Sequence, residues 1–375
     1  MNAALPEPGP EALAVSRALL GRIGAELTAH GNWISFARYM ELVLYEPGLG
    51  YYAGGAAKLG AAGDFVTAPE MGTLFARTLA RQVADILAPG EALLEFGAGS
   101  GALAAALLDT LPAGTPYLIL EPSAELRERQ RARLAGRARW LERLPQRFRG
   151  VILANEVVDA MPVHALAWTA NGVMERGVCA NEGTLAWSER PAQGELAAAA
   201  REIAIKLPPS GRYESEIGLA ARGWMRSLGA VLERGALLAI DYGFTAREYY
   251  HPQRSMGTLM CHYRHRAHGD PFYLPGLQDV TAHVDFSALA RAAHAAGFEI
   301  LGYASQASFL IECGITELLA ETDPDDIARY APLAAEANRL LSPAEMGELF
   351  KVLAVGRGVP TPLAGFAHGD RSHTL

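Results

Sequence analysis

The sequence contains little cysteine. Cys179, Cys261 and Cys313 are its only cysteines, they lie far apart, and no Cys-x-x-Cys pair occurs among the 375 residues. A disulfide framework and a thiolate zinc site both need paired or closely spaced cysteines, so the sequence argues against both. Unpaired thiols are typical of proteins kept in a reducing compartment, and we therefore expect a cytoplasmic location.

Positive charge is also scarce. The chain carries 33 lysine and arginine residues against 41 acidic residues, which gives a net charge of −8. A general nucleic-acid binder needs a basic surface to meet phosphates, so we expect no nucleic-acid partner. Hydrophobic residues make up 50% of the sequence, which is enough for a large core and excludes global disorder.

Long apolar segments are missing as well. The best apolar run, residues 96–108, is short and rich in glycine, so it is unsuited to spanning a bilayer. The first residues include Glu7 and Glu11 and lack a basic stretch, which argues against a signal or transit peptide. We expect a protein without a membrane span.

What is present is an alternation of short apolar strands and helices. Helices are predicted over residues 101–111 and 123–134. The strands that alternate with them are predicted over residues 92–96, 117–120, 150–154 and 236–240, with a last strand over 350–355. This alternation is typical of an α/β fold, in which helices cover both faces of a parallel sheet.

Two stretches interrupt the alternation. Residues 163–207 contain Asn-Gly and Glu-Gly turns between short alternating runs, which predicts inserted β-hairpins. Residues 243–282 lack periodicity, as expected of a functional loop or lid. In this loop His262, His265 and His268 are spaced by three, but the Gly-Asp-Pro sequence that follows favours a loop over a helix. We therefore expect no metal site.

The strongest local signal is a glycine-rich turn between a strand and a helix. Gly97, Gly99 and Gly101 permit a tight turn and let a ligand approach the backbone closely. Glu121 follows Gly101 by 20 residues, at the end of the next predicted strand. A carboxylate in that position can accept hydrogen bonds from both hydroxyls of a ribose.

Three interpretations of this turn remain open: a dinucleotide site, an S-adenosylmethionine site and a purely structural turn. Glu95, two residues before the first glycine of the turn, favours the methyl donor, whose ammonium group needs a nearby carboxylate. Strands that bind dinucleotides usually carry an apolar residue at that position.

A second polar segment, residues 155–162, directly follows a predicted strand. Ligands in open parallel sheets bind beyond the carboxyl ends of the strands. Asn155 would then lie near a cofactor, and Glu156 and Asp159 near a substrate. Alternatively, Asn155 caps a helix whose first turn carries the two acids. Position alone leaves both interpretations open.

A third segment, residues 63–70, lies well before the sheet. Phe65, between small and polar residues, would fold over a cofactor. Asp64 and Thr67 are equally suited to a turn or to a helix cap, and the residue types alone favour this structural interpretation.

Together these motifs resemble the MidA family, the bacterial and mitochondrial relatives of the complex I assembly methyltransferase. The resemblance runs from about residue 33 to about residue 314, with the strand near Lys351 in addition. It rests on ISFARYMELVLYEPGLGYY (34–52), GDFVTAPE (63–70), ANEVVDAMPV (154–163), IDYG (240–243), EYYHPQR (248–254), GTL (257–259), YRHRAH (263–268) and QDVTAHVDF (278–286). The glycine turn departs from the frequent Gly-Pro-Gly-Arg-Gly form but keeps all three glycines.

The resemblance implies a class I seven-stranded methyltransferase sheet, which is Rossmann-like. The segments expected are a helical N-terminal segment that packs on the core and covers the cofactor (1–90), the core (91–162 and 211–242), a β-hairpin insertion (163–210), a substrate-facing loop region (243–284), the rest of the core with a helical insertion (285–356) and a frayed tail (357–375).

The resemblance also implies S-adenosyl-L-methionine as the cofactor and an arginine of a protein, such as a respiratory complex I subunit, as the acceptor. Gly97, Gly99 and Gly101 would cradle the cofactor, Glu121 would hold its ribose, and Gly63 and Asp64 would close over it. Glu156, with Asp159 beside it, would face the substrate, and His283 would either relay a proton or have a structural role.

Two alternatives to arginine methylation remain open. The first is a methyltransferase for a small molecule or another side chain. The second is a non-catalytic assembly factor that binds the cofactor and docks a partner through the hairpins. The sequence leaves the oligomeric state open, a homodimer included. Tyr213–Ile217 stands where relatives often have a shorter Glu-Ile-Ser-Pro run, which leaves the substrate less defined.

Overall fold

Residues 5–54 and 67–375 are described by a computed structural model of the chain. They divide into two compact units that interleave along the sequence. The stretches of the first unit are residues 5–54, Asp159–Gly223 and Ala246–His283, and those of the second are residues 67–158, Trp224–Thr245 and Val284–Leu375. Each unit therefore builds its core from three separate stretches of chain.

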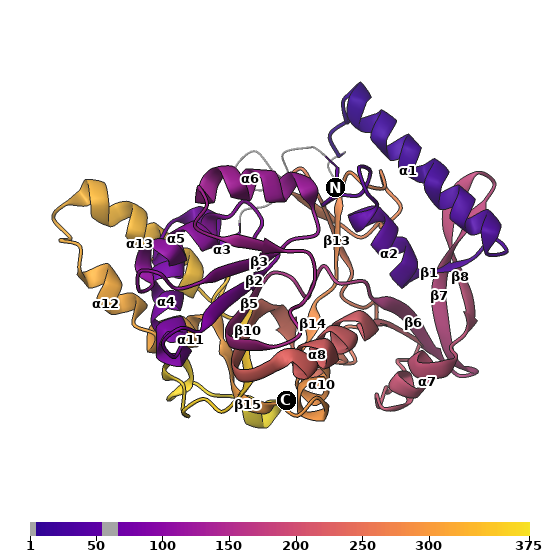
Figure 1. Cartoon of the computed structure of the whole chain (residues 1–375). Coiled ribbons are helices and arrows are strands. Elements are labelled where there is room, and N and C mark those ends of the chain that lie inside the picture. The colour runs from indigo at the N-terminus through magenta and orange to yellow at the C-terminus, as the bar shows by residue number, and fades with distance from the viewer. Residues whose placement is uncertain (1–4, 55–66) are drawn as a thin grey trace. The chain divides into compact units, whose positions relative to one another are not determined.

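The second unit contains the predicted α/β sheet, and its main path has seven strands in the order β15-β16-β10-β5-β2-β3-β4 (Figure 1). These strands are β2 (Ala92–Phe96), β3 (Tyr117–Leu120), β4 (Arg139–Leu141), β5 (Phe148–Asn155), β10 (Leu232–Phe244), β15 (Glu299–Ser305) and β16 (Phe350–Arg357). The strands from β4 to β10 pair in parallel, whereas β16 is antiparallel to both of its neighbours. The two-residue β14 (Val284–Asp285) pairs with the end of β10, off this path.

The central strands are apolar along their length because both faces of the sheet are buried. Leu93 of β2, Val151 of β5 and Leu238 of β10 have no exposed surface. Helices of the same unit contribute to this core, in particular α4 (Leu74–Ile86), α5 (Ala102–Thr110), α11 (Gln306–Glu312), α12 (Ile315–Ala320) and α13 (Ile327–Leu341). The remaining helices are α3 (Ala68–Met71), α6 (Ala124–Leu134), α10 (Phe286–Ala295) and α8 (Leu219–Val231), which begins in the first unit.

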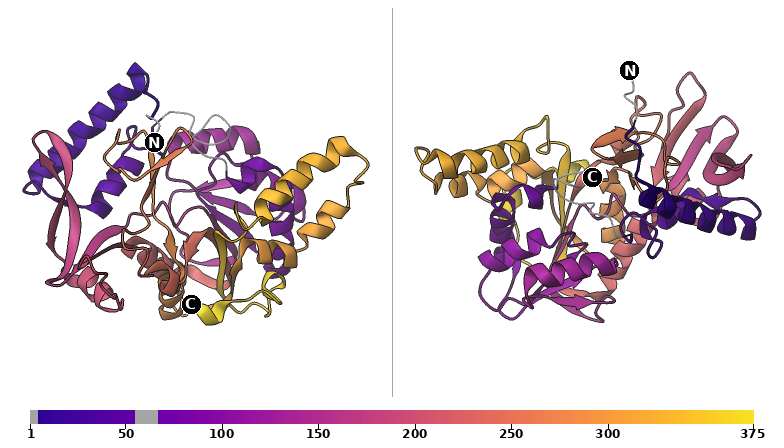
Figure 2. Two further views of the ribbon diagram at one scale, coloured as in Figure 1. Left: turned by 180° about the vertical axis from the view of Figure 1, so that it is seen from behind. Right: turned by 90° about the horizontal axis from the view of Figure 1, so that it is seen from above.

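The C-terminal part of the second unit is tied to its start. Glu336 of α13 accepts hydrogen bonds from the backbone N–H groups of Leu74 and Phe75, at 2.8 and 3.1 Å, and so caps α4. Figure 2 shows α12 and α13 as neighbouring helices of this unit. Residues 321–326 separate these two helices, which lie in the segment where a helical insertion was predicted.

Residues 357–375 are not the frayed tail that the sequence predicted. Leu363 and Phe366 are buried, and the Phe366 ring lies 5.3 Å from the ring of Phe309. Two short 3-10 helices, Ala364–Phe366 and Ser372–Thr374, occur in this segment. The mainly polar and small residues around these two anchors hid them in the sequence.

The first unit contains the predicted hairpins, which pair as a five-stranded sheet. Its strands are β1 (Ile34–Ser35), β6 (His164–Thr169), β7 (Gly172–Asn181), β8 (Thr184–Pro191) and β9 (Arg212–Ile217), and β7 pairs with β1, β6 and β8. Glu182 and Gly183, between β7 and β8, both have positive φ angles, as a two-residue hairpin turn requires. β9 pairs with β6 in this sheet, so its assignment to the core was wrong.

The stretch that was predicted to be an irregular loop contains a small antiparallel sheet. Its strands are β11 (Met260–Tyr263), β12 (Arg266–His268) and β13 (Asp279–Thr281). The short helices α7 (Gly194–Arg201) and α9 (Ala246–Tyr249) complete this unit together with α1 and α2. Within the described residues, no helix combines the length and apolarity needed to cross a membrane.

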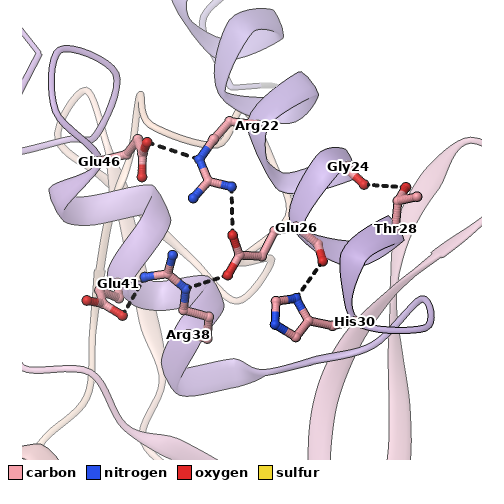
Figure 3. A network of polar contacts seen from close by, with 8 residues as sticks. All are labelled: Arg22, Gly24, Glu26, Thr28, His30, Arg38, Glu41 and Glu46. Carbon is pink, nitrogen blue, oxygen red and sulfur yellow. Dashed lines mark hydrogen bonds and ion pairs between the residues drawn. The ribbon is translucent and has the colours of Figure 1, made fainter.

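The first two helices, α1 (Pro10–Ala29) and α2 (Phe36–Tyr45), are joined by ion pairs (Figure 3). Ser35 caps α2 by accepting a hydrogen bond from the N–H of Arg38. Glu26 of α1 lies between Arg22 and Arg38, at 2.6 and 2.9 Å. Hydrogen bonds from Arg38 and Arg22 lower the pKa of Glu26 to about 2, so this carboxylate stays charged at every physiological pH.

Candidate functional site

The predicted cofactor residues that the structure describes lie at one edge of the sheet of the second unit. β2 pairs in parallel with β3 on one side and with β5 on the other, so the carboxyl ends of all three strands are adjacent. The glycine turn follows β2, Glu121 follows β3, and Asn155 ends β5. This is the edge at which open parallel sheets bind their ligands.

The glycine turn has the backbone that its sequence predicted. Gly97, Gly99 and Gly101 have φ angles of 60°, 53° and 80°, a region that favours glycine over residues with a side chain. Gly101 is the N-cap residue of α5. A Cβ atom added to Gly97 would lie 3.3 Å from Cγ2 of Val157, in the turn after β5. The turn therefore offers bare backbone where a ligand would approach.

Glu95 is buried at the end of β2, with 3% of its surface exposed. The hydroxyl of Tyr117 donates a hydrogen bond to its carboxylate at 2.7 Å. Burial raises the pKa of Glu95 to about 7, with repulsion from Glu121 adding to the shift and the Tyr117 hydrogen bond opposing it. A cation bound here would stabilise the charged carboxylate.

Glu121 is held by two donors from α6 and the loop before it. Its Oε1 accepts a hydrogen bond from the N–H of Ser123 at 3.0 Å, and its Oε2 accepts one from Nε2 of Gln130 at 3.1 Å. Burial raises the pKa of this carboxyl, and the hydrogen bonds oppose the shift. These contacts fix the carboxyl group at the end of β3, where a ribose would be bound.

Gln130 is a site residue that sequence reasoning missed. Its Nε2 also donates to the carbonyl oxygen of Gly99 at 2.9 Å, and its Oε1 accepts from Nε1 of Trp140 at 2.8 Å. One buried amide thus links the glycine turn to Glu121. A single glutamine on a helix full of polar residues gave no signal in the sequence.

The turn after β5 has an unusual backbone at Glu156. Its φ angle is 53°, which costs a non-glycine residue on the order of 1 kcal/mol or more. The N–H of Glu156 donates to the carbonyl of Ile240 at 2.9 Å, and Oδ2 of Asp241 accepts from the N–H of Val158 at 2.9 Å. Neighbouring β10 therefore holds the strained turn in place.

The alternative in which Asn155 caps a helix is wrong. Residues 156–162 form turns and bends, and no helix begins there. The side-chain N–H of Asn155 donates to Oε1 of Glu156 at 3.2 Å. Its own Oδ1 is buried without a hydrogen-bond partner within residues 5–54 and 67–375. Buried acceptors are normally hydrogen-bonded, so a ligand bound at this edge would be expected to donate a hydrogen bond to this oxygen.

The other predicted substrate residues, Asp159 and His283, belong to the first unit. Asp159 is 6% exposed, and its carbonyl accepts the N–H of Ala282 at 3.1 Å, so the backbone next to His283 is tied to Asp159. The N–H of His283 donates to the hydroxyl oxygen of Thr258 at 3.2 Å. Gly63 and Asp64 lie outside the described residues.

Glu216 of β9 is a second residue that sequence reasoning left without a role. It is 3% exposed and accepts hydrogen bonds from both the N–H and the hydroxyl of Thr258, each at 2.9 Å, and from the hydroxyl of Tyr249 at 3.2 Å. Because Thr258 also binds the backbone of His283, the Glu216 carboxyl fixes the loop that leads to His283. Burial raises its pKa, and these hydrogen bonds oppose the shift.

The three histidines of the loop region lie on and between two strands. His262 is in β11, His268 is in β12, and His265 is in the turn that joins them, with a positive φ angle. Across the ladder His262 is opposite Ala267, and His268 is opposite Cys261. No group of histidine, cysteine and acidic side chains suited to a metal occurs in the part of the chain that the structure describes.

The edge of the sheet fits S-adenosylmethionine by its donors and acceptors. It offers bare glycine backbone, a buried carboxyl for an ammonium, a second carboxyl for a ribose, and the orphaned oxygen of Asn155. A seven-strand sheet of this order, with these groups at the ends of its first strands, defines a Rossmann-like S-adenosylmethionine-dependent methyltransferase.

Comparison with known proteins gives the family. Residues 74–304 match the family Methyltransf_28, described as "Putative S-adenosyl-L-methionine-dependent methyltransferase", and the chain belongs to it. A crystal structure of a COG1565 superfamily member from Burkholderia thailandensis, bound to S-adenosyl-homocysteine, is 52% identical, with a TM-score of 0.94 over 99% of this chain and 100% of that one. This membership confirms the predicted MidA resemblance.

Curated relatives share most of their length with this chain. The zebrafish (Danio rerio) protein named "Protein arginine methyltransferase NDUFAF7, mitochondrial" is 29% identical over 91% of this chain and 87% of its own length. The human protein of the same name is 28% identical over 86% of this chain and 80% of its own length. The chain is therefore an enzyme of the methyltransferase class that uses S-adenosyl-L-methionine.

Proposed function

We propose that the protein methylates an arginine side chain of a protein acceptor. The names of the curated relatives support an arginine acceptor. The observation that carries the proposal is the strained backbone of Glu156 at the carboxyl end of β5. Strain of this kind is kept where a side chain must be aimed, and a carboxylate is the group that binds a guanidinium with two hydrogen bonds.

The bound cofactor would supply an electrophilic methyl group on a positively charged sulfur. A guanidinium nitrogen forms the new N–CH3 bond as the S–CH3 bond breaks, and the guanidinium then loses one proton. Glu156 would accept two N–H groups of the acceptor and so orient the attacking nitrogen toward the methyl group. Its negative charge would also favour the cation that exists before the proton leaves.

The other predicted residues have supporting roles in this proposal. Asp159 would hold a second edge of the guanidinium, and His283 would take the departing proton or keep a structural role. Glu95 would bind the ammonium of the cofactor, and Asn155 would contact the cofactor through its free oxygen. Gly63 and Asp64 would close over the cofactor.

The resemblance to the MidA family makes a subunit of respiratory complex I the first acceptor to examine. A cytoplasmic location, expected from the unpaired cysteines, completes the proposal. The runner-up functions are methylation of another side chain or a small molecule, and a non-catalytic scaffold that binds the same cofactor. The experiment that follows distinguishes these outcomes.

The test compares proteins from a deletion strain with those of its parent by mass spectrometry. We expect one protein to lose methylation on an arginine, and the purified enzyme with labelled donor to restore it. Restored methylation on a different residue type would overturn the arginine assignment. If the protein binds the cofactor but transfers no methyl group to any component of the deletion-strain extract, the non-catalytic scaffold is the better interpretation.

A further inference from the structure

The first unit contains a surface cavity of about 550 Å³ beside the turn that carries Asp159. Its walls come from α2, from the start of β6 and from the start of α8, and the lining residues are Ser35, Ala37, Arg38, Glu41, Tyr45, Pro162, His164 and Ala220. A volume of this size is ordinary for a ligand site. None of the groups in its wall is used by the chemistry described so far.

The cavity presents hydrogen-bond acceptors. Arg38 is already bound on two sides, with its Nε 2.9 Å from Glu26 and its Nη1 2.7 Å from Glu41 (Figure 3). The side chain of Glu41 keeps 54% of its surface exposed. Nδ1 of His164 lies 2.7 Å from Oε1 of Glu175. Because a carboxylate only accepts, Nδ1 of His164 is the donor in this contact.

The charge balance of the wall is negative. The chain of ion pairs that ends at Glu41 holds three carboxylates against two guanidinium groups; these residues are Glu26, Glu41 and Glu46, against Arg22 and Arg38. An incoming anion would meet this excess of carboxylates, whereas an ammonium or guanidinium group would be attracted. Tyr45, Pro162 and the two alanines offer apolar surface for the aliphatic stem of a long basic side chain.

The cavity is also continuous with the turn predicted to face the substrate. The hydroxyl of Tyr45 donates to the carbonyl oxygen of Ala160 at 2.9 Å, and Pro162 of the same turn lines the cavity. Asp159 precedes Pro162 by three residues. A polypeptide with one side chain at Asp159 would therefore have neighbouring residues within reach of the cavity.

We propose that this cavity binds a lysine or arginine side chain of the protein acceptor, close in sequence to the arginine that is methylated. The charged end of that side chain contacts Glu41, and its stem packs on Tyr45 and Pro162. The inference rests on the proposed function, because it takes the acceptor to be a protein. If the cavity binds in this way, basic residues next to the methylated arginine help to determine which protein is the acceptor.

The direct test is a calorimetric titration of the full chain with the peptide Gly-Arg-Gly-Lys-Gly and with its acidic counterpart Gly-Glu-Gly-Glu-Gly. We expect the basic peptide alone to bind, and Glu41→Gln to weaken its affinity about fivefold or more. Glu182→Gln, an equal charge change at the exposed turn between β7 and β8, should leave the affinity unchanged. Equal affinities of the two variants, or no binding by the parent protein, would overturn the assignment.

A second variant guards against indirect effects of Glu41→Gln on Arg38. Ala220 is exposed at the start of α8 and lines the cavity, so Ala220→Trp should fill the cavity without disturbing the core. We expect it to abolish peptide binding while S-adenosylhomocysteine affinity stays at the parent value. Retained peptide binding by Ala220→Trp would place the peptide elsewhere and refute the proposal.

Kinetics with the acceptor recovered from the deletion strain separate this inference from the proposed function. Glu41→Gln should raise the KM for the acceptor about fivefold and leave kcat unchanged, because the contact is remote from the transferred methyl group. An unchanged KM with an arginine acceptor would sink the cavity assignment alone. Methylation of another residue type would refute the proposed function. The peptide titration would still test whether the cavity binds a basic side chain.

Discussion

The hydroxyl of Tyr117 in β3 donates a 2.7 Å hydrogen bond to the buried carboxyl of Glu95 in β2. The two strands pair in parallel, so the sheet itself brings the phenol to the carboxyl group. This single donor does not offset the cost of burying a charge, and the pKa of Glu95 stays raised, at about 7. The ligand-free protein therefore holds a titratable group at the cofactor edge in the neutral range of pH.

The first prediction concerns the stability of the ligand-free protein. The pKa of Glu95 is about 7 in the folded state, against an ordinary value of 4.5 for a glutamate side chain. Its stabilising contribution is therefore complete below pH 4.5 and is lost as pH rises through about 7, by up to roughly 3 kcal/mol. Urea unfolding at pH 5 and pH 8 should show this loss in the parent and a smaller one in Glu95→Gln. Equal pH dependence in both proteins would show that Glu95 is charged when folded.

The second prediction is that cofactor binding releases a proton. If Glu95 binds the ammonium group, the bound state favours the charged carboxylate, so affinity for S-adenosylhomocysteine should rise between pH 6 and pH 8. Calorimetry in buffers of different ionisation enthalpy measures the proton directly. Glu95→Gln should bind more weakly and release no proton. If the affinity of the parent protein for S-adenosylhomocysteine does not change between pH 6 and pH 8, Glu95 does not bind the ammonium group.

The third prediction concerns the glycine turn. Gly99 has a φ angle of 53°, and a β-branched side chain there would be strained and would occupy the ligand's approach. Gly99→Val should abolish binding of S-adenosylhomocysteine, and NAD should bind to neither protein. Gly183→Val is the control, because Gly183 also has a positive φ angle but lies in the β7–β8 turn. Loss of cofactor binding by the control as well would point to general unfolding.

The fourth prediction concerns Glu156. Glu156→Gln is nearly isosteric and should keep the fold and the cofactor affinity. It replaces an anion that accepts two N–H groups with an amide that has one donor end, so kcat/KM should fall about 100-fold or more. Asp159→Asn should have a milder effect. Full activity of Glu156→Gln on an arginine acceptor would remove this residue from the mechanism.

The fifth prediction concerns the loop that leads to His283. Gly257 has a φ angle of 77°, and a Cβ atom there would lie 2.1 Å from Oε1 of Glu216. Gly257→Ala should lower the free energy of unfolding by about 2 to 4 kcal/mol. Gly269→Ala, in the same region with open space around its Cα, should change it by less than about 0.5 kcal/mol. Similar midpoints in urea for the two variants would contradict the tight packing.

The sequence predicts the sheet well because burial on both faces forces its strands to be apolar. The strands β2, β3 and β5, and the helices α5 and α6, lie within a few residues of their predicted ranges. The edge strand β4 was not predicted, because its three residues are half exposed and carry no periodic pattern. β9 was predicted for the core, because a short strand does not reveal which sheet it will join.

The site is predictable where glycine or an acid directly follows a strand. The positive φ angles of the glycine turn and the position of Glu121 follow from that rule. Gln130 and Glu216 could not be found in this way, because each acts through contacts with residues distant in sequence. Gln130 reaches Gly99 from 31 positions away, and Glu216 reaches Thr258 from 42. Pairings of this kind depend on the tertiary fold rather than on local pattern.

The position of β16 in the sheet has a consequence for synthesis of the chain. This strand, Phe350–Arg357, lies between β10 and β15 and hydrogen-bonds to both. While the ribosome is still adding residues before 350, β10 has an unpaired edge on that side and β15 has no partner in the sheet. Because exposed strand edges promote aggregation, the nascent chain is vulnerable from the synthesis of β10 until β16 has been made. Its need for chaperones should fall sharply once β16 leaves the ribosome.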